Sequence, residues 1–257
     1  MKKIIFILLL VVVSGCSKNT FEPFLIHDRS LPDSISETKN SSGISETKFS
    51  IRPECMNDDC KPNNTRSELY EDVWERKIYG LGQPKTAWYG YELFLPDSFP
   101  SAKEQNGRYL LGQWHNGLCP HISVVNRRDG DQLGIAFSRV EENKYGCTDI
   151  FRGSYLPFSE LSDMRNQWTK LEFEITWDEK EGKAIVFVNG QKKLEHQGST
   201  LTLDLPKKHQ GVNRFSYGIY LCCTNDYQQI IPTYVKYRNV SRATRREDLL
   251  VNVAQSR

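Results

Sequence analysis

Short runs of alternating apolar and polar residues, with no long helical repeat between them, constrain the fold of this chain most. Leu171, Phe173 and Ile175, for example, alternate with polar residues, as in a strand that buries one face. Asn189-Gly190, between two such runs, is a strong hairpin signal. The predicted strands cover residues 86–95, 108–115, 121–126, 132–138, 169–177, 183–188, 192–196, 214–222 and 232–240. A short helix at 160–166 is the one helical alternative before the C-terminal segment.

Many short strands without intervening helices indicate an all-β fold, a sandwich of two antiparallel sheets or a barrel. We expect one domain over residues 51–245, because about 195 residues suffice for a single core and rarely build two. Residues 246–257 form a charged C-terminal end, and we expect either a short helix or a loose tail there.

The first 16 residues have the pattern of an export signal. A basic start, MKK, precedes an apolar run at 4–13 and the small residues before Cys16. The run is too short for a spanning helix. VSGC at 13–16 resembles the lipobox of bacterial lipoproteins, which implies lipidation of Cys16, export and anchoring to the cell envelope through lipid.

Residues 17–50 are polar and contain the sequence ISETK twice, at 35–39 and 44–48. We interpret this low-complexity segment as a flexible tether between the lipid and the domain. The net charge of +2 gives no reason to expect a nucleic-acid partner.

Six cysteines remain after Cys16, and an even number in an exported chain favours disulfides. Fifteen pairings are open, and Cys55 with Cys60 and Cys119 with Cys147 are the pairs that we favour. The other two cysteines are Cys222 and Cys223. Zinc is a weaker alternative, since His115, Cys119 and His121 cluster without a standard zinc spacing.

The strand at 108–115 carries the first candidate site. Alternation places Gln113 and His115 on one face, about 7 Å apart along the strand. The same alternation sets Leu110 and Trp114 on the core face, and Tyr109 and Leu111 with Gln113 and His115. A single strand histidine is more often structural, so this pair needs support from other segments.

Two other segments offer that support. Arg66 and Glu68 share a face if their segment is extended, and an arginine there can hold a carboxylate through two hydrogen bonds. In the strand at 214–222, alternation places the side chain of Tyr217 on the core face and that of Tyr220 on the opposite face. We expect Gly218 to leave space beside Tyr220 for a ligand.

Several motifs in order resemble one enzyme family. They are RSEL at 66–69, WYGYELFLP at 88–96, GQWH at 112–115, the strand pair from Trp168 to Gly190, YGIY at 217–220 and YVKYRNV at 234–240. Together they resemble the polysaccharide lyase family that contains heparin lyase I and glucuronan lyase. The resemblance implies a β-jelly roll, a concanavalin-like sandwich whose concave sheet binds a sugar chain.

The resemblance also implies β-elimination on a polysaccharide that contains uronic acid. Gln113, with help from Arg66, would neutralise the substrate carboxylate. His115 would be the base or a second neutralising group, and Tyr220 the acid, or acid and base together. Glu68, Arg214, Ser216 and Asn116 complete the expected site as substrate-binding residues.

One departure from the family pattern concerns the substrate. Ser216 stands where the heparin lyases carry lysine, and the nearest cation is Arg214. This disfavours heparin and favours an unsulfated acidic glycan such as glucuronan.

Two rival functions use the same fold. One is a glycan-binding lipoprotein without catalysis. The other is a hydrolase with Glu172 and Glu174 as its carboxylate pair. We expect no required cofactor and no bound metal. A Ca²⁺ site at Asn57-Asp58-Asp59 stays open as an alternative. We expect a monomer whose partners are the acidic polysaccharide and, through lipid, a membrane.

Overall fold

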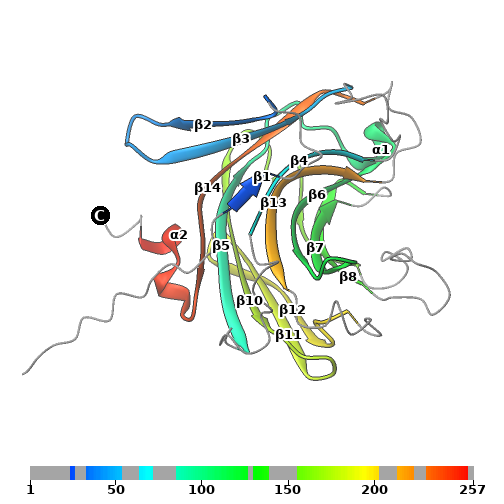
Figure 1. Ribbon diagram of the computed structural model, residues 1–257, viewed down its shortest axis with the longest axis vertical. Coiled ribbons are helices and arrows are strands. Elements are labelled where there is room, and N and C mark those ends of the chain that lie inside the picture. Colours follow the sequence, from blue (N-terminus) through cyan, green and yellow to red (C-terminus); the bar gives the residue numbers. More distant parts are fainter. Residues whose placement is uncertain are drawn as a thin grey trace, which may run out of the picture.

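The computed structural model describes residues 24–26, 33–53, 64–71, 85–126, 130–138, 155–202, 213–222 and 230–253. In these residues the strands form two antiparallel sheets of seven strands each (Figure 1). The first sheet consists, in spatial order, of β1 (Phe24–Ile26), β4 (Asn64–Glu71), β13 (Arg214–Cys222), β6 (Arg108–His115), β7 (Pro120–Asn126), β8 (Gln132–Phe137) and β9 (Tyr155–Glu160). The second consists of β12 (Gln191–Gly198), β11 (Gly182–Val188), β10 (Trp168–Thr176), β5 (Thr86–Phe94), β14 (Thr233–Ala243), β3 (Ser45–Ile51) and β2 (Ile35–Lys39).

The all-β sandwich predicted from the alternating pattern is confirmed. β6 and β13 have the predicted bounds, and Asn189-Gly190 forms the tight turn between β11 and β12, with φ of 50° and 82°. The helix expected at 160–166 is wrong. Glu160 ends the edge strand β9, and Met164 and Arg165 lie in turns closed by Leu161 O.

An aromatic core fills the space between the two sheets. Trp114 on β6 and Tyr237 on β14 are fully buried, and Tyr89 and Tyr91 of β5 pack against the same cluster. The Trp114 ring lies 5.1 Å from that of Tyr89 and 5.2 Å from that of Phe215, measured between ring centroids. Aromatic pairs at such distances add stabilisation beyond the area that they bury.

The tether predicted for residues 17–50 is wrong over residues 33–50. The two copies of ISETK lie in β2 and β3, which pair with each other at one edge of the second sheet. Asn40 closes the hairpin, because its side-chain oxygen accepts hydrogen bonds from the backbone N–H groups of Ser42 and Ile44, both at 3.0 Å. Phe49, directly after the second copy, is 0% exposed and belongs to the core.

For the charged C-terminal end, the alternative of a short helix is confirmed, and that of a loose tail is wrong for residues 246–253. They form η2 (Arg246–Asp248) and α2 (Leu250–Val253), which lie on the outer side of β5 and β14 (Figure 1). Leu249 and Val251 are buried there against Gly90, where a Cβ atom would lie only 3.0 and 3.1 Å from their side chains.

The helices in the described residues are short. Besides η2 and α2 there is α1 (Ala102–Gln105). Its start is stabilised by a capping box, in which the side chains of Ser101 and Glu104 each accept a hydrogen bond from the backbone N–H of the other residue. Within the described ranges no helix is long and apolar enough to cross a membrane. The proposed signal segment and Cys16 lie outside those ranges.

The cysteine predictions are tested only in part. Cys119 and Cys222 each take part in a disulfide. Cys55, Cys60, Cys147 and Cys223 lie outside the described residues, so the pairing stays a prediction.

Candidate active site

The second half of β6 has the predicted orientation. Trp114 is 0% exposed in the core, and Gln113 and His115 on either side of it belong to the outer face of the first sheet. Gln113 pairs with Ser216 on β13 and with Ser123 on β7. The outer face therefore collects polar side chains from neighbouring strands.

The first half of β6 has the opposite orientation, and the alternation predicted for it is wrong. Tyr109 and Leu111 lie in the core, whereas Leu110 lies in a separate outer cluster with Val125 and Ala136. The cause is a shift in the pairing of β6 with β7, between Leu110 and Gly112. Such a bulge inserts an extra residue and reverses the faces beyond it.

Four side chains on this outer face are connected. The Gln113 side-chain amide donates to a carboxylate oxygen of Glu68 at 2.8 Å, and the other oxygen of Glu68 lies 3.2 Å from Nε of Arg66. The guanidinium of Arg66 lies over the Tyr220 ring, 3.8 Å from its centroid. Gln113 and Tyr220, far apart in sequence, are thus joined through Glu68 and Arg66.

Glu68 lies beneath this face. It was expected to bind substrate, but its side chain is 0% exposed. Burial raises the pKa of the Glu68 carboxyl, an effect larger than the lowering by Arg66, Gln113 and Arg214. Glu68 therefore orients Gln113 and Arg66 from below.

His115 and Arg214 form the next group along the same face. They are cross-strand neighbours, and the Arg214 guanidinium lies 4.7 Å from the ring centroid of Tyr70. The backbone N–H of Gly117 donates to Nδ1 of His115 at 2.8 Å. Since an N–H can only donate, Nδ1 is an acceptor, and in neutral His115 the proton is on Nε2.

The prediction that Gly218 leaves room for a ligand is wrong. A Cβ atom at Gly218 would lie 2.3 Å from the carbonyl oxygen of Ser67 and 2.8 Å from Cα of Glu68. The neighbouring strand β4 occupies this space. With φ of 138°, the position also favours glycine for its backbone conformation.

Three polar residues complete the picture. Asn116, expected to bind substrate, is 0% exposed, and its oxygen accepts from the N–H groups of Leu118 and Cys119, so it shapes the turn after β6. Ser216 is 4% exposed beside Gln113. Ser123 was missed from sequence, although alternation within 121–126 places it outward. Its buried hydroxyl has no hydrogen-bond partner among the described residues.

The described residues contain no group of three or more His, Cys, Asp or Glu side chains that could hold a metal ion. His121 is instead buried beside Thr202, whose backbone N–H donates to Nδ1 of His121 at 2.9 Å. The alternative Ca²⁺ site at 57–59 lies outside the described residues.

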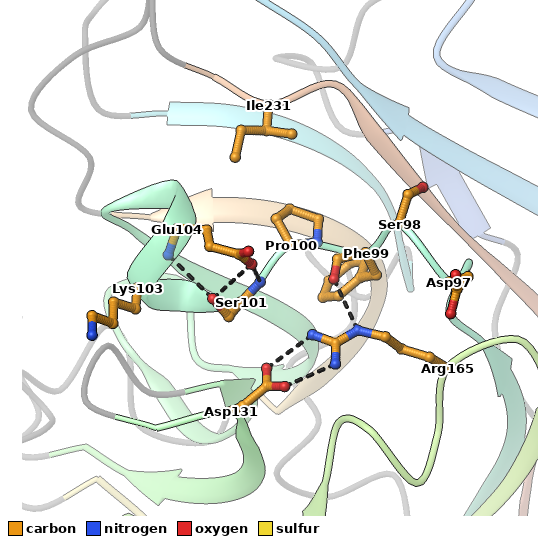
Figure 2. Close-up of a pocket in the computed structure, with 10 residues that line it drawn as sticks. All are labelled: Asp97, Ser98, Phe99, Pro100, Ser101, Lys103, Glu104, Asp131, Arg165 and Ile231. Atoms are coloured by element: carbon orange, nitrogen blue, oxygen red, sulfur yellow. Dashed lines mark hydrogen bonds and ion pairs between the residues drawn. The ribbon is translucent and has the colours of Figure 1, made fainter.

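A surface pocket of about 830 Å³ lies apart from this cluster, beside α1 (Figure 2). Three of the charged groups that line it, Arg165, Asp131 and Glu104, are already engaged. Arg165 donates to both oxygens of Asp131, at 2.8 and 3.0 Å, and to the Phe99 carbonyl oxygen, while Glu104 caps α1 through Ser101 (Figure 2). The pocket therefore offers weaker chemistry than the Gln113 cluster.

Comparison with known families shows the class of protein to which this chain belongs. Residues 20–236 match the family model described as Polysaccharide lyase. The chain belongs to the polysaccharide lyase family. It is therefore an enzyme, a lyase that acts on polysaccharides, and the matched region includes the outer face described above. No curated protein sequence matches.

Solved structures show the same jelly-roll sandwich. An endo-β-1,4-glucuronan lyase from Trichoderma reesei has a TM-score of 0.62 at 16% identity, over 90% of this chain and 94% of that one. A family 131 β-glucanase domain from Podospora anserina has a TM-score of 0.55 at 11% identity, over 87% and 86%. An alginate lyase from Chlorella virus has 0.49 at 12%, over 81% and 88%. At these identities the first two structures show the fold alone, and not the substrate.

Proposed function

We propose that this polysaccharide lyase cleaves a glycan rich in uronic acid by β-elimination on the outer face of its first sheet. The observation that carries the proposal is the connected group of Gln113, Glu68, Arg66 and Tyr220. A buried carboxylate holds an amide and a guanidinium at a sheet face, and a phenol lies against the guanidinium.

Each group meets one demand of the reaction. A base removes the proton from C5 of the uronate, the electrons form a C4=C5 double bond, and the C4–O bond breaks as its oxygen takes up a proton. Negative charge grows on the uronate carboxylate, where the second N–H of the Gln113 amide donates. Glu68 engages the first N–H at 2.8 Å and so fixes the direction of the second.

The hydrogen bond to His115 favours one of its two expected roles. Because Nδ1 accepts from Gly117, Nε2 of neutral His115 is a donor. This suits neutralisation of the carboxylate and not abstraction of the C5 proton. Tyr220 is then both base and acid, and Arg66 over its ring stabilises negative charge on the phenol oxygen.

A single residue can serve as base and acid when the C5 proton and the C4 oxygen lie on the same side of the ring, as in glucuronate. A lyase with the same fold, that of T. reesei, acts on glucuronan, which agrees with glucuronate although a shared fold does not fix the substrate. We therefore propose a glucuronan-like substrate. The expected likeness to heparin lyase I stays a prediction, and Ser216 in place of lysine argues against heparin.

The test is absorbance near 235 nm, which reports unsaturated uronate, on a panel of glucuronan, alginate blocks, polygalacturonate and heparin. We expect activity on glucuronan. Tyr220→Phe should reduce kcat by about 10²–10⁴-fold, the range of one acid–base group. A folded protein that binds glucuronan and leaves it uncut would favour the rival function, a glycan-binding protein.

We further propose that the enzyme is exported and anchored to the cell envelope through lipid on Cys16. The lipobox-like sequence VSGC at 13–16 supports this. Labelling with radioactive palmitate in a bacterial host should mark the wild type and not Cys16→Ser. Equal labelling of both would count against the anchor.

A further inference from the structure

One buried hydroxyl from the opposite sheet contacts both strands of the candidate site. Tyr237 on β14 is fully buried. Its hydroxyl lies within hydrogen-bond distance of the carbonyl oxygens of Leu111 on β6 and Gly218 on β13, the latter at 2.8 Å. Leu111 lies two residues before Gln113, and Gly218 two residues before Tyr220.

These two carbonyls lie where regular pairing between β6 and β13 is interrupted. The register shifts between Ser216 and Tyr220, so that three residues of β13 face two of β6. Gln113 pairs with Ser216 on one side of the shift, and Tyr220 pairs with Leu110 on the other. The relative placement of Gln113 and Tyr220 therefore depends on the geometry of this irregular stretch.

The Tyr237 ring is itself held firmly. Its centroid lies 5.5 Å from that of Phe49, 5.3 Å from Tyr91 and 5.3 Å from Tyr217. Burial raises the pKa of its hydroxyl well above the ordinary value, so the group stays a donor at any working pH. A rigid donor thus faces both bulged backbones from the core.

We propose that Tyr237 is a positioning residue for catalysis, which sets the spacing of Gln113 and Tyr220 by hydrogen bonding across the core to Leu111 and Gly218. The inference rests on the proposed function of those two residues. Tyr237 does not touch substrate, so its loss should disturb the chemical step more than substrate binding.

The chain offers a matched control. The Tyr91 hydroxyl is buried in the same core and has no hydrogen-bond partner among the described residues. Tyr91→Phe and Tyr237→Phe remove the same atom from the same environment. Only the second removes a hydrogen bond to the irregular stretch.

The experiment compares both variants with wild type on glucuronan. Tyr237→Phe should lower kcat by up to about 10²-fold, the cost of a displacement near 1 Å, with KM within about threefold. Tyr91→Phe should stay within about twofold in both constants. Replacing Tyr237 by 4-aminophenylalanine, whose amine has one N–H for each carbonyl, should restore kcat.

Two readouts separate this inference from the proposed function. If the wild type is inactive on every polyuronate, the proposed function is wrong. The positioning role can still be tested, because crystal structures of the variants report the positions of Gln113 and Tyr220. The positioning role is overturned if those side chains do not move in Tyr237→Phe, or if an active wild type loses no more kcat through Tyr237→Phe than through Tyr91→Phe. In a Gln113→Ala background, the effect of Tyr237→Phe should shrink, since the two act on one geometry.

Discussion

Two fully buried glutamates, one in each sheet, should respond in opposite ways to the loss of their charge. Glu68 lies under the candidate site, where burial raises its pKa. Glu172 on β10 accepts from Arg246 at 3.0 and 2.8 Å and from Asn252 at 2.9 Å. Burial alone would raise the pKa of Glu172, but these hydrogen bonds lower it below the ordinary value.

The expected magnitudes follow from these environments. Glu172→Gln breaks a two-fold charge-assisted contact and leaves Arg246 without its carboxylate partner, which should cost about 3 kcal/mol. For a domain of this size, that is a fall of about 6–12 °C in Tm. Glu68→Gln should cost only about 1 kcal/mol, because burial of the Glu68 charge offsets part of its attraction to Arg66, and the amide oxygen still accepts from Gln113.

Activity should show the reverse order. Glu68→Gln removes the charge that orients Arg66 and should lower kcat, whereas Glu172→Gln should leave kcat unchanged. The assays are thermal unfolding by circular dichroism and the rise in absorbance at 235 nm. A Glu68→Gln variant that loses as much stability as Glu172→Gln, at full activity, would refute the reasoning.

The pH dependence of stability gives an independent check. A raised pKa means that folded Glu68 retains its proton above the ordinary value of 4.5, so its contribution to stability is present below 4.5 and lost as pH rises through the folded pKa. The contribution of Glu172 is present above 4.5 and lost as pH falls through its lowered pKa. Urea unfolding of each variant against wild type across this range should show slopes of opposite sign.

Three further predictions concern the fold that supports the site. Gly218→Ala should prevent stable folding, because the new Cβ would meet Ser67 O at 2.3 Å, and soluble protein with wild-type Tm would contradict this. Phe49→Ala should destabilise the fold by about 3–5 kcal/mol, as for other core aromatic residues, whereas an unchanged Tm would show that residues 33–50 are a tether and not part of the folded domain. Deleting residues 246–257 should lower Tm by exposing the buried face beneath Leu249, and equal Tm values would show that this segment contributes nothing.

The strands that the sequence predicted well are those with one clearly buried face. β13 alternates core residues with outward ones, and its predicted bounds were correct. β2 was missed because an edge strand needs little apolar surface, and four of its five residues are exposed. β3, between β2 and β14, was missed because it repeats the polar sequence of β2 before its buried end at Phe49 and Ile51. β9 was missed because Pro157 argues against a strand, although an edge strand tolerates it.

The site was predictable as a set of residues and not as a geometry. The order of the motifs in the sequence identified Arg66, Gln113 and Tyr220 as candidates. In the structure Glu68 links Gln113 to Arg66, and Arg66 lies over the ring of Tyr220. The bulge at Leu111 could not be read from alternation, since a single extra residue leaves no mark in composition. The role of Tyr237 depends on that bulge and was equally hidden.

The central claim, that this face performs elimination, is tested most directly by cleavage of glucuronan in water enriched in ¹⁸O. Elimination adds no water across the cleaved bond. We therefore expect each cleavage to leave one fragment with a C4=C5 double bond at its new non-reducing end, which absorbs at 235 nm, and to incorporate no ¹⁸O from the water. Gln113→Ala and Tyr220→Phe should slow the formation of these unsaturated products, Tyr220→Phe by about 10²–10⁴-fold. Saturated products that carry ¹⁸O would instead show hydrolysis and contradict the account.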